Sequence, residues 1–403
     1  MIDSMTEVVP PLGLARYSAL FRVPHVRRLV LSGMLARLPA GMIGLALLLL
    51  VREHGGTYAA AGAVSGGYFV ATAVGAPIAG RLVDRRGQAR ILLTRAVVFP
   101  ALLLGVCLLA LLDAPLVLIG LAAAAAGALM PPVGASLRAL WPRMFGDPEL
   151  RAAAYALEAS LQEITFIVGP LLVALLTAAS SPAVALGVAA VLGGAGTLLI
   201  ALAEPVRAWR PDDERHTSLL GALASRGVVT LVGLSACLGL GFGGTEVAFP
   251  AFAEQHGGAE LGSIPLSLFA GGSLIGGLLV GARVTVPPLR LLRISALLLT
   301  LGLALPLLGW SLPSMAVLAF VAGLAIAPVV MSAYGLVDAV AARGTAAEAF
   351  SWITTAVFAG FSVGMALGGT LIDAYGSKSS FLLGTAAAAA GAALVAAGPG
   401  LGD

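Results

Sequence analysis

Six charged residues lie inside long apolar stretches of the sequence: Arg37, Glu158, Glu163, Glu246, Asp338 and Glu348. A charge in an apolar membrane segment is costly, so such residues pair with one another, face a wet cavity or carry protons. The first four lie deep in their stretches, and we expect them to supply the charges of a central cavity. Asp338 and Glu348 lie near the ends of theirs, where structural pairing at the interface is the preferred interpretation.

Arg37 and the two glutamates of residues 151–178 lie at similar depth. At about 1.5 Å per helical residue, Arg37 is roughly 14 Å from the end of its helix, Glu158 roughly 10 Å and Glu163 roughly 18 Å. Arg37 can therefore pair with either carboxylate if the two helices are neighbours. Glu163 points about 140° away from Glu158 around the helix, which indicates different roles. We expect Glu163 to alternate between an ion pair with Arg37 and a protonated state.

Glu246 directly follows a glycine-rich run from Gly239 to Gly244. Glycine weakens helices, so this run is expected to loosen or break its helix. Broken membrane helices expose backbone dipoles beside binding sites. Glu246 is therefore the second candidate proton carrier. The alternative is a structural glutamate that bonds to the freed backbone groups.

Aromatic residues make up only 6% of the chain. Those that could line a central cavity, with simple packing as the alternative for each, are Tyr68, Phe69, Phe166, Phe242, Phe269, Tyr334 and Trp352. His54 and His256 stand at equivalent helix ends and are interpreted as interfacial residues rather than ligands.

No other chemistry is indicated. The sequence lacks a phosphate-binding Gly-x-x-x-x-Gly-Lys-Ser/Thr loop, an HExxH motif and a plausible Ser/His/Asp constellation. Cys107 and Cys237 lie in apolar runs, without disulfide or metal spacing. We therefore expect neither a cofactor nor a metal, and not an enzyme.

The elements that must position these residues are membrane helices. Hydrophobic residues make up 59% of the 403 residues and charged residues 11%, far from the balance of a soluble domain. Runs of about 20 apolar residues, long enough to cross a bilayer, recur along the chain. The twelve predicted spans are 28–51, 58–83, 91–112, 115–141, 151–178, 182–203, 227–253, 260–282, 289–310, 313–340, 346–374 and 380–398.

The basic residues predict the orientation of these spans. When the loops are assigned alternately to the two sides, all but three of the 23 basic residues fall on the side of the termini. Arg52 and Lys378 fall on the other side, and Arg37 lies within the first span. Basic residues concentrate in cytoplasmic loops, so both termini are predicted to be cytoplasmic. The Arg-, Ala- and Gly-rich composition suggests a bacterial cytoplasmic membrane.

The chain also repeats itself. An offset of 202 aligns His54 with His256 and Gly75 with Gly277, and an offset of 196 aligns Pro132 with Pro328. The repeat predicts two six-helix halves, residues 1–203 and 227–403, joined by a charged segment at 204–226.

One motif resembles a known family. Residues 80–90, Gly-Arg-Leu-Val-Asp-Arg-Arg-Gly-Gln-Ala-Arg, resemble the pattern GxLxDRxG of the major facilitator superfamily, which a basic residue follows, here Arg90, and they lie between the second and third spans. Gly80 would allow two helices to approach closely, and Gly87 a tight turn. By this resemblance the loop is a conformational latch of the outward-facing state, formed by Gly80, Asp84, Arg85, Gly87 and Arg90 with Arg138 as a further cation. The second-half counterpart, at 282–288, lacks the Asp and both glycines.

The resemblance implies an all-helical membrane protein of two pseudo-symmetric bundles that transports by alternating access. Gly169-Pro170 resembles the Gly-Pro pair of twelve-helix drug:H⁺ antiporters, although Leu171 and Leu172 follow where that motif has glycine, and a simple kink is the alternative. The preferred function is proton-coupled efflux of a small organic compound. The alternative is import of a sugar, amino acid or organic anion. The expected partners are that compound, protons and the bilayer, with no nucleic acid, and the chain is expected to be a monomer.

Overall fold

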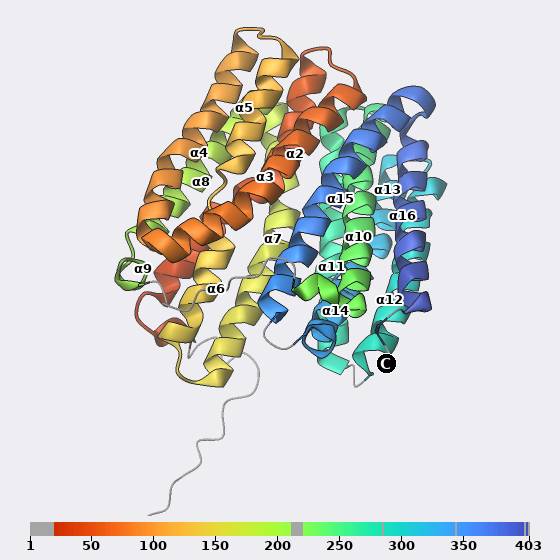
Figure 1. Ribbon diagram of the computed structural model, residues 1–403. Coiled ribbons are helices and arrows are strands. Elements are labelled where there is room, and N and C mark those ends of the chain that lie inside the picture. The colour runs from red at the N-terminus through yellow and green to blue at the C-terminus, as the bar shows by residue number, and fades with distance from the viewer. Residues whose placement is uncertain (1–19, 211–220, 284–285, 343–344, 399, 402–403) are drawn as a thin grey trace, which may run out of the picture.

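The computed structural model describes residues 20–210, 221–283, 286–342, 345–398 and 400–401, and within these ranges all regular secondary structure is helical (Figure 1). Twelve helical segments are long and apolar enough to cross a membrane, which confirms the predicted spans to within a few residues. The first six comprise α2 (Val26–Glu53), α3 (Tyr58–Arg86), α4 (Gln88–Leu111), α5 (Leu116–Ala128) with α6 (Val133–Met144), α7 (Pro148–Ala179) and α8 (Pro182–Ala201).

The short helices α9 (Glu204–Ala208) and η1 (Ala222–Ala224) lie between the sixth and seventh spans. The last six spans comprise α10 (Arg226–Glu254), α11 (Ser263–Arg283) preceded by η2 (Ala259–Gly262), α12 (Pro288–Ala304) with η3 (Leu305–Leu308), α13 (Leu312–Gly323) with α14 (Ile326–Val340), α15 (Ala346–Tyr375) and α16 (Ser377–Ala397).

Glycine makes the tightest connections between spans. Gly87 alone separates α3 from α4, with a φ of 83°, and its N–H donates to the carbonyl of Val83 at 2.8 Å. Gly376 makes a similar one-residue turn between α15 and α16, with a φ of 82°. Other residues pay a steric cost at such angles. The turn predicted at Gly87 is confirmed.

The fourth and tenth spans are each interrupted at the same relative point. α5 ends at Ala128 and α6 begins at Val133, after Pro131 and Pro132, which have no N–H to continue a helix. α13 likewise ends at Gly323, just before Pro328 in the first turn of α14. The interruptions therefore follow the offset of 196 seen in the sequence.

The predicted break at Gly239–Gly244 is wrong. α10 is continuous from Arg226 to Glu254, and its glycines serve close helix packing instead. A Cβ on Gly239 would overlap the carbonyl of Val357, and one on Gly243 would overlap that of Phe361. Because α15 lies this close, packing stabilises the helix that low glycine propensity would weaken.

Glycine also allows two further pairs of helices to cross closely, at equivalent places of the two repeats. Gly127 on α5 lies against the carbonyl of Tyr68 on α3, and Gly323 on α13 lies against that of Phe269 on α11.

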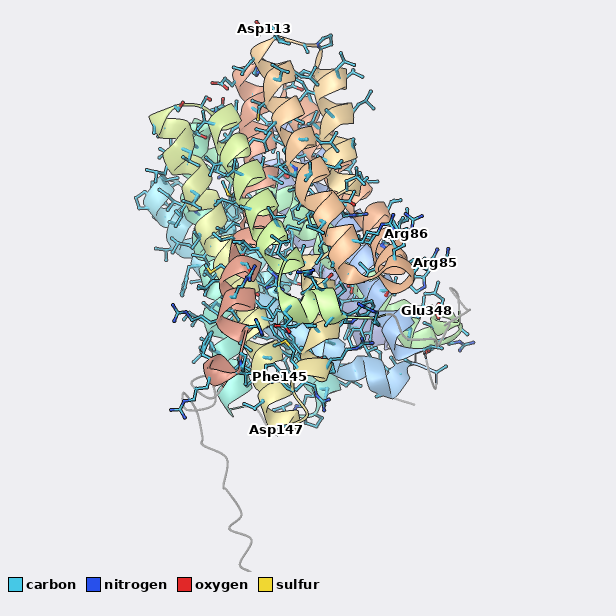
Figure 2. The ribbon with its side chains drawn as sticks, turned by 90° about the vertical axis from the view of Figure 1, so that its left-hand side faces the viewer. Arg85, Arg86, Asp113, Phe145, Asp147 and Glu348 are labelled. Carbon is cyan, nitrogen blue, oxygen red and sulfur yellow. The ribbon has the colours of Figure 1, made fainter. Side chains whose placement is uncertain are left out.

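The first and last six spans join where α3 runs beside α15 and α7 beside α11 (Figure 1). The described chain begins and ends at one end of the bundle, here called the inner end. Asp113 lies at the opposite, outer end, and Phe145 and Asp147 lie at the inner end (Figure 2).

The basic bias predicts that the inner end is cytoplasmic. Arg86 is exposed at the inner end and Gln255 at the outer end. With the native cysteines replaced by serine, Gln255→Cys should react with a membrane-impermeant maleimide in intact cells, whereas Arg86→Cys should react only after permeabilisation. The opposite pattern would reverse the orientation.

Candidate functional site

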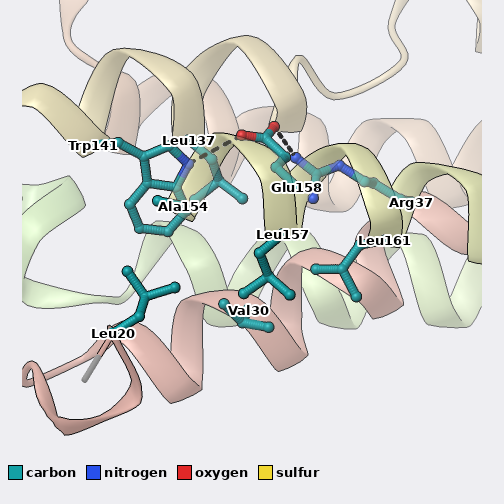
Figure 3. Close-up of a pocket in the computed structure, with 9 residues that line it drawn as sticks. All are labelled: Leu20, Val30, Arg37, Leu137, Trp141, Ala154, Leu157, Glu158 and Leu161. Atoms are coloured by element: carbon teal, nitrogen blue, oxygen red, sulfur yellow. Dashed lines mark hydrogen bonds and ion pairs between the residues drawn. The ribbon is translucent and has the colours of Figure 1, made fainter. Parts of the chain in front are cut away.

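A buried ion cluster joins three helices of the first six spans (Figure 3). Arg37 on α2 is 6% exposed and donates to Oε1 of Glu158 on α7, which is 4% exposed. Trp141 on α6 donates from Nε1 to the other carboxylate oxygen at 3.0 Å. Arg138, also on α6, brings its Nε within 3.5 Å of Oε1. Glu158 therefore has three partners, as a buried carboxylate requires.

Of the two carboxylates that the sequence left open for Arg37, the structure pairs it with Glu158, and the expected pair with Glu163 is not formed in this conformation. The angular separation of the two glutamates explains the outcome. Glu158 faces α2 and α6, while Glu163 lies beside Ser273 of α11, at a geometry short of a formed hydrogen bond. Glu163 therefore lies at the contact between the first and last six spans, with no cationic partner among the described residues.

Arg95 on α4 is a buried cation that sequence reasoning missed, since it was counted with a helix end. It is 5% exposed, and its Nη1 donates to the carbonyl of Met130 at 2.6 Å. Met130 lies just beyond the carboxyl end of α5, where a cation is favoured by the helix dipole. The break before Pro131 therefore supplies the partner for Arg95.

Glu246 lies on α10 where that helix approaches α2. A Cβ on Gly44 would lie 3.2 Å from Oε1 of Glu246 and 3.4 Å from the ring of Phe69 on α3. No hydrogen bond or ion pair joins Glu246 to any described residue. Glu246 lies about 12 Å along α10 from the outer end of that helix.

Phe69 is the centre of an aromatic cluster beside this carboxylate. Its ring centroid lies 4.7 Å from that of Phe361 and 6.5 Å from that of Phe358, both on α15, and 5.2 Å from that of Tyr68. The cluster thus spans the junction between the first and last six spans.

A second polar cluster joins the first six spans to the last six at the outer end. Arg52 on α2 donates to Glu254 on α10 at 2.7 Å, and the hydroxyl of Tyr58 donates to the same carboxylate at 2.8 Å. Asp373 on α15 accepts the first N–H groups of α3, from Tyr58 at 3.0 Å and Ala59 at 2.7 Å. A carboxylate at a helix amino terminus satisfies free donors and complements the dipole.

The sequence analysis missed this outer cluster of Arg52, Tyr58, Glu254 and Asp373. A signal was present, since Arg52 and Glu254 are 202 residues apart and so occupy equivalent positions of the repeat. Below it, Gly62 and Gly66 of α3 lie against the backbone of α15.

Among the described side chains of the expected latch, no ion pair joins one member to another at the inner end. A Cβ on Gly80 would meet nothing within 4 Å, so the close approach expected there is not made in this conformation. Arg85 and Arg90 are exposed, and Arg138 binds Glu158. The side chain of Asp84 lies outside the described part of the structure.

The remaining candidates have varied surroundings. Glu348 accepts the N–H of Ala222 at 3.2 Å, which is the structural pairing expected of it. The side chain of Asp338 lies outside the described set. His54 bonds to the carbonyls of Leu50 and Ala110, and the first of these bonds raises its pKa above the usual value.

The candidate aromatic residues differ in how far they are buried. Tyr68 and Phe269 are buried in the helix core, so the expectation that they line a cavity is not met in this conformation. Phe242 packs edge-on against Phe269, and Tyr334 against Phe350. Phe166 and Tyr334 are exposed, whereas Phe69 and Trp352 are half-buried.

Most of this chain is similar to a known protein family and to several solved structures. The sequence profile described as the Major Facilitator Superfamily matches residues 29–349. No curated protein sequence matches significantly. Similar solved structures include the nucleoside transporter NupG, at a TM-score of 0.76 and 14% identity, covering 92% of this chain and 98% of that one.

Two other solved structures are similar at low identity. A POT family transporter in complex with a thioalcohol-conjugated peptide has a TM-score of 0.72 and 12% identity, covering 93% and 96%. The human organic anion transporter MFSD10 has a TM-score of 0.67 and 16% identity, covering 93% and 99%. At these identities the likeness shows the fold alone.

Removing the charge of Asp373 should favour a conformation open at the outer end. Asp373→Asn weakens two charge-assisted hydrogen bonds to α3, worth about 1.4 kcal/mol or a tenfold shift in the equilibrium. Spin labels at Leu112 and Gln255, both exposed at the outer end, should then report longer distances by pulsed electron resonance. Glu254→Gln should act in the same direction.

The matched control is Glu53→Gln, an exposed carboxylate beside Arg52 at the same end. Its distance distribution should equal that of the unaltered chain. Distributions unchanged in both Asp373→Asn and Glu254→Gln would show that the outer cluster does not hold this end closed.

Proposed function

The chain belongs to the major facilitator superfamily of secondary transporters, and from that premise we propose that it exports a small organic compound in exchange for protons. The observation that carries the proposal is the position of two carboxyl groups, Glu163 and Glu246. Both lie where the first six spans meet the last six, and neither has a cationic partner among the described residues.

Carboxyl groups in this position are suited to proton transfer. An unpaired carboxylate is costly in an apolar setting, so protonation relieves the cost when the surrounding helices close on it. When the same helices separate, water stabilises the charged form and the proton can leave. A group at a moving interface therefore links proton binding to conformation.

Arg37 and Glu158 have a different role in this proposal. Their pair lies within the first six spans and has two further donors to the carboxylate, so it stays fixed while the halves move. Removing one member of a buried pair typically costs about 3–5 kcal/mol. Arg37 is thus needed for folding more than for coupling.

We assign the conformation to the state that is open toward the inner end. The outer cluster and the packing of Gly62 and Gly66 close the outer part of the α3–α15 contact. The open surroundings of Gly80 support a separated inner part. In the opposite state the two halves, 1–203 and 227–403, would rotate so that Asp84 binds across the closed inner end.

Neutralising the two proton carriers should abolish coupling. In proteoliposomes, Glu163→Gln should still support counterflow of a labelled compound that the unaltered chain transports, since it mimics the protonated side chain. Accumulation driven by a pH gradient should fall to the level of equilibration in both Glu163→Gln and Glu246→Gln, while Glu53→Gln should retain it. Full gradient-driven accumulation in both variants would instead favour the alternative, facilitated import of a sugar, amino acid or organic anion.

Asp84→Asn should slow transport without weakening substrate binding. The substitution preserves size but removes the charge that the proposed latch requires, so the equilibrium should move several-fold toward the inner-open state. Transport rate and substrate affinity should be measured together, with Arg86→Gln as a control in the same loop. An unaltered transport rate in Asp84→Asn would contradict the latch.

A further inference from the structure

A groove between α2 and α8 opens at the inner end of the bundle. It has a volume of about 570 Å³, within the range of small-molecule sites, about 300–1,000 Å³. Its lining has a basic part and an apolar part. The basic part consists of His25, Arg27 and Arg28, and the apolar part consists mainly of Leu31, Leu35 and Leu199.

The positive charge at the mouth of this groove is only partly compensated by the protein. Arg28 donates from Nη2 to the carbonyl of Leu199 at 3.3 Å, which is a neutral acceptor. His25 lies 3.3 Å from Glu204, whose side chain is 81% exposed. No hydrogen bond or ion pair joins Arg27 to any described residue, and both arginines are exposed. Two guanidinium groups are therefore available to an anion from outside the protein.

The start of α2 adds to this positive potential. The helix begins at Val26, so Arg27 and Arg28 lie in its first turn, which contains no acidic residue. The first N–H groups of a helix lack partners within it, and the helix dipole places a partial positive charge there. Cations are disfavoured and anions favoured at such a position. An anion bound beside the two arginines would offset both their charges and the dipole.

The apolar part of the groove continues along the same face of α2. Arg27, Leu31 and Leu35 are spaced four residues apart, so they lie one above another on the helix. Leu31 is 58% exposed and Leu199 is 41% exposed. At about 1.5 Å per residue, Leu31 lies about 8 Å and Leu35 about 14 Å from the start of the first membrane span. A ligand that uses the whole groove therefore has an anionic head and an apolar chain.

Other ligand classes use only part of this groove. A water-soluble phosphate would bind the arginines but gain nothing from the leucines. A zwitterionic phosphatidylcholine would bring its own cationic group beside the arginines, which offsets the attraction of its phosphate. Anionic lipids are abundant in the cytoplasmic leaflet, which is where the basic bias places this end of the bundle.

We propose that the groove binds one anionic phospholipid, with its phosphate at Arg27 and Arg28 and an acyl chain along the leucines. Basic pockets between membrane helices on the cytoplasmic side bind lipids of this kind. The bound lipid bridges the inner ends of α2 and α8, both in the first six spans. Its binding requires neither a transported compound nor a proton gradient.

The test compares two lipids with the same dioleoyl chains and different head groups, anionic phosphatidylglycerol and zwitterionic phosphatidylcholine. The purified full chain is freed of lipid in a neutral detergent. Native mass spectrometry then counts the lipid molecules that it binds as the lipid concentration rises. We expect the first phosphatidylglycerol to bind at least about tenfold more tightly than the first phosphatidylcholine. Equal affinity for the two lipids would overturn the proposal.

Charge variants locate the bound phosphatidylglycerol. Arg27→Gln should weaken its binding about fivefold, and Arg27→Gln combined with Arg28→Gln about 25-fold. Arg27→Lys should retain most of the affinity, because an ammonium group also binds phosphate. The matched control, Arg86→Gln combined with Arg290→Gln, removes two exposed charges from the same end of the bundle and should leave the affinity unchanged. An equal loss in both double variants would reveal a general charge effect and overturn the site.

A further variant and a competitor distinguish a lipid from a soluble anion. Leu31→Gln should weaken phosphatidylglycerol binding without any change of charge, because an unpaired amide beside an acyl chain is costly. Glycerol phosphate at millimolar concentration should not displace the lipid. Displacement by glycerol phosphate, or unaltered binding in Leu31→Gln, would overturn the lipid assignment.

Folding of each variant is checked by gel filtration and thermal unfolding. Arg27→Gln removes no contact to a described residue, so it tests the site even if the double variant fails to fold. Unaltered phosphatidylglycerol binding in a folded Arg27→Gln chain would also overturn the site.

Discussion

The need to neutralise charge inside an apolar layer constrains the whole arrangement. A carboxylate or guanidinium at the centre of a bilayer has no water to solvate it, so the fold must bring a partner to it. Around Glu158 this requirement fixes α2, α6 and α7 relative to one another, because each contributes a donor or the acceptor. Around Arg95 the partner is the end of a broken helix, so the interruption at Pro131 is part of the electrostatic design as well as of the backbone path.

Where a buried carboxylate has no cationic partner, the helices around it are suited to a change of conformation. Glu163 and Glu246 lie at the surfaces along which the two sets of spans touch, rather than within either set. Close glycine packing holds the helices on the outer side of this contact, with Gly62 and Gly66 against the backbone of α15. Because such packing depends on few interlocking side chains, two surfaces of this kind can separate and meet again without repacking a core.

The sequence predicted what depends on local pattern. The twelve spans follow from apolar length, the turn at Gly87 from its backbone freedom, and the paired interruptions from the repeat of Pro132 at Pro328. It failed where the partner of a residue is distant in the chain. Depth alone left Arg37 two possible carboxylates, and only the angular position of α7 against α2 selects Glu158. The glycines of residues 239–244 predicted a break, because helix propensity takes no account of a neighbouring helix. Asp373 was not predicted as a site residue, because its partners, the first N–H groups of α3, are distant in the chain.

The bridge between Arg52 and Glu254 also bears on how such a chain could arise. These residues occupy equivalent positions of the two repeats and meet each other. In a dimer of identical subunits, a residue beside the two-fold axis faces its own copy, so arginine would oppose arginine and glutamate would oppose glutamate. A bridge of opposite charges at this place is open only to two different sequences. If the halves descend from a duplicated ancestor, the bridge between Arg52 and Glu254 was acquired after the two copies diverged. A dimer built from two identical copies of either half would place like charges against each other at this position.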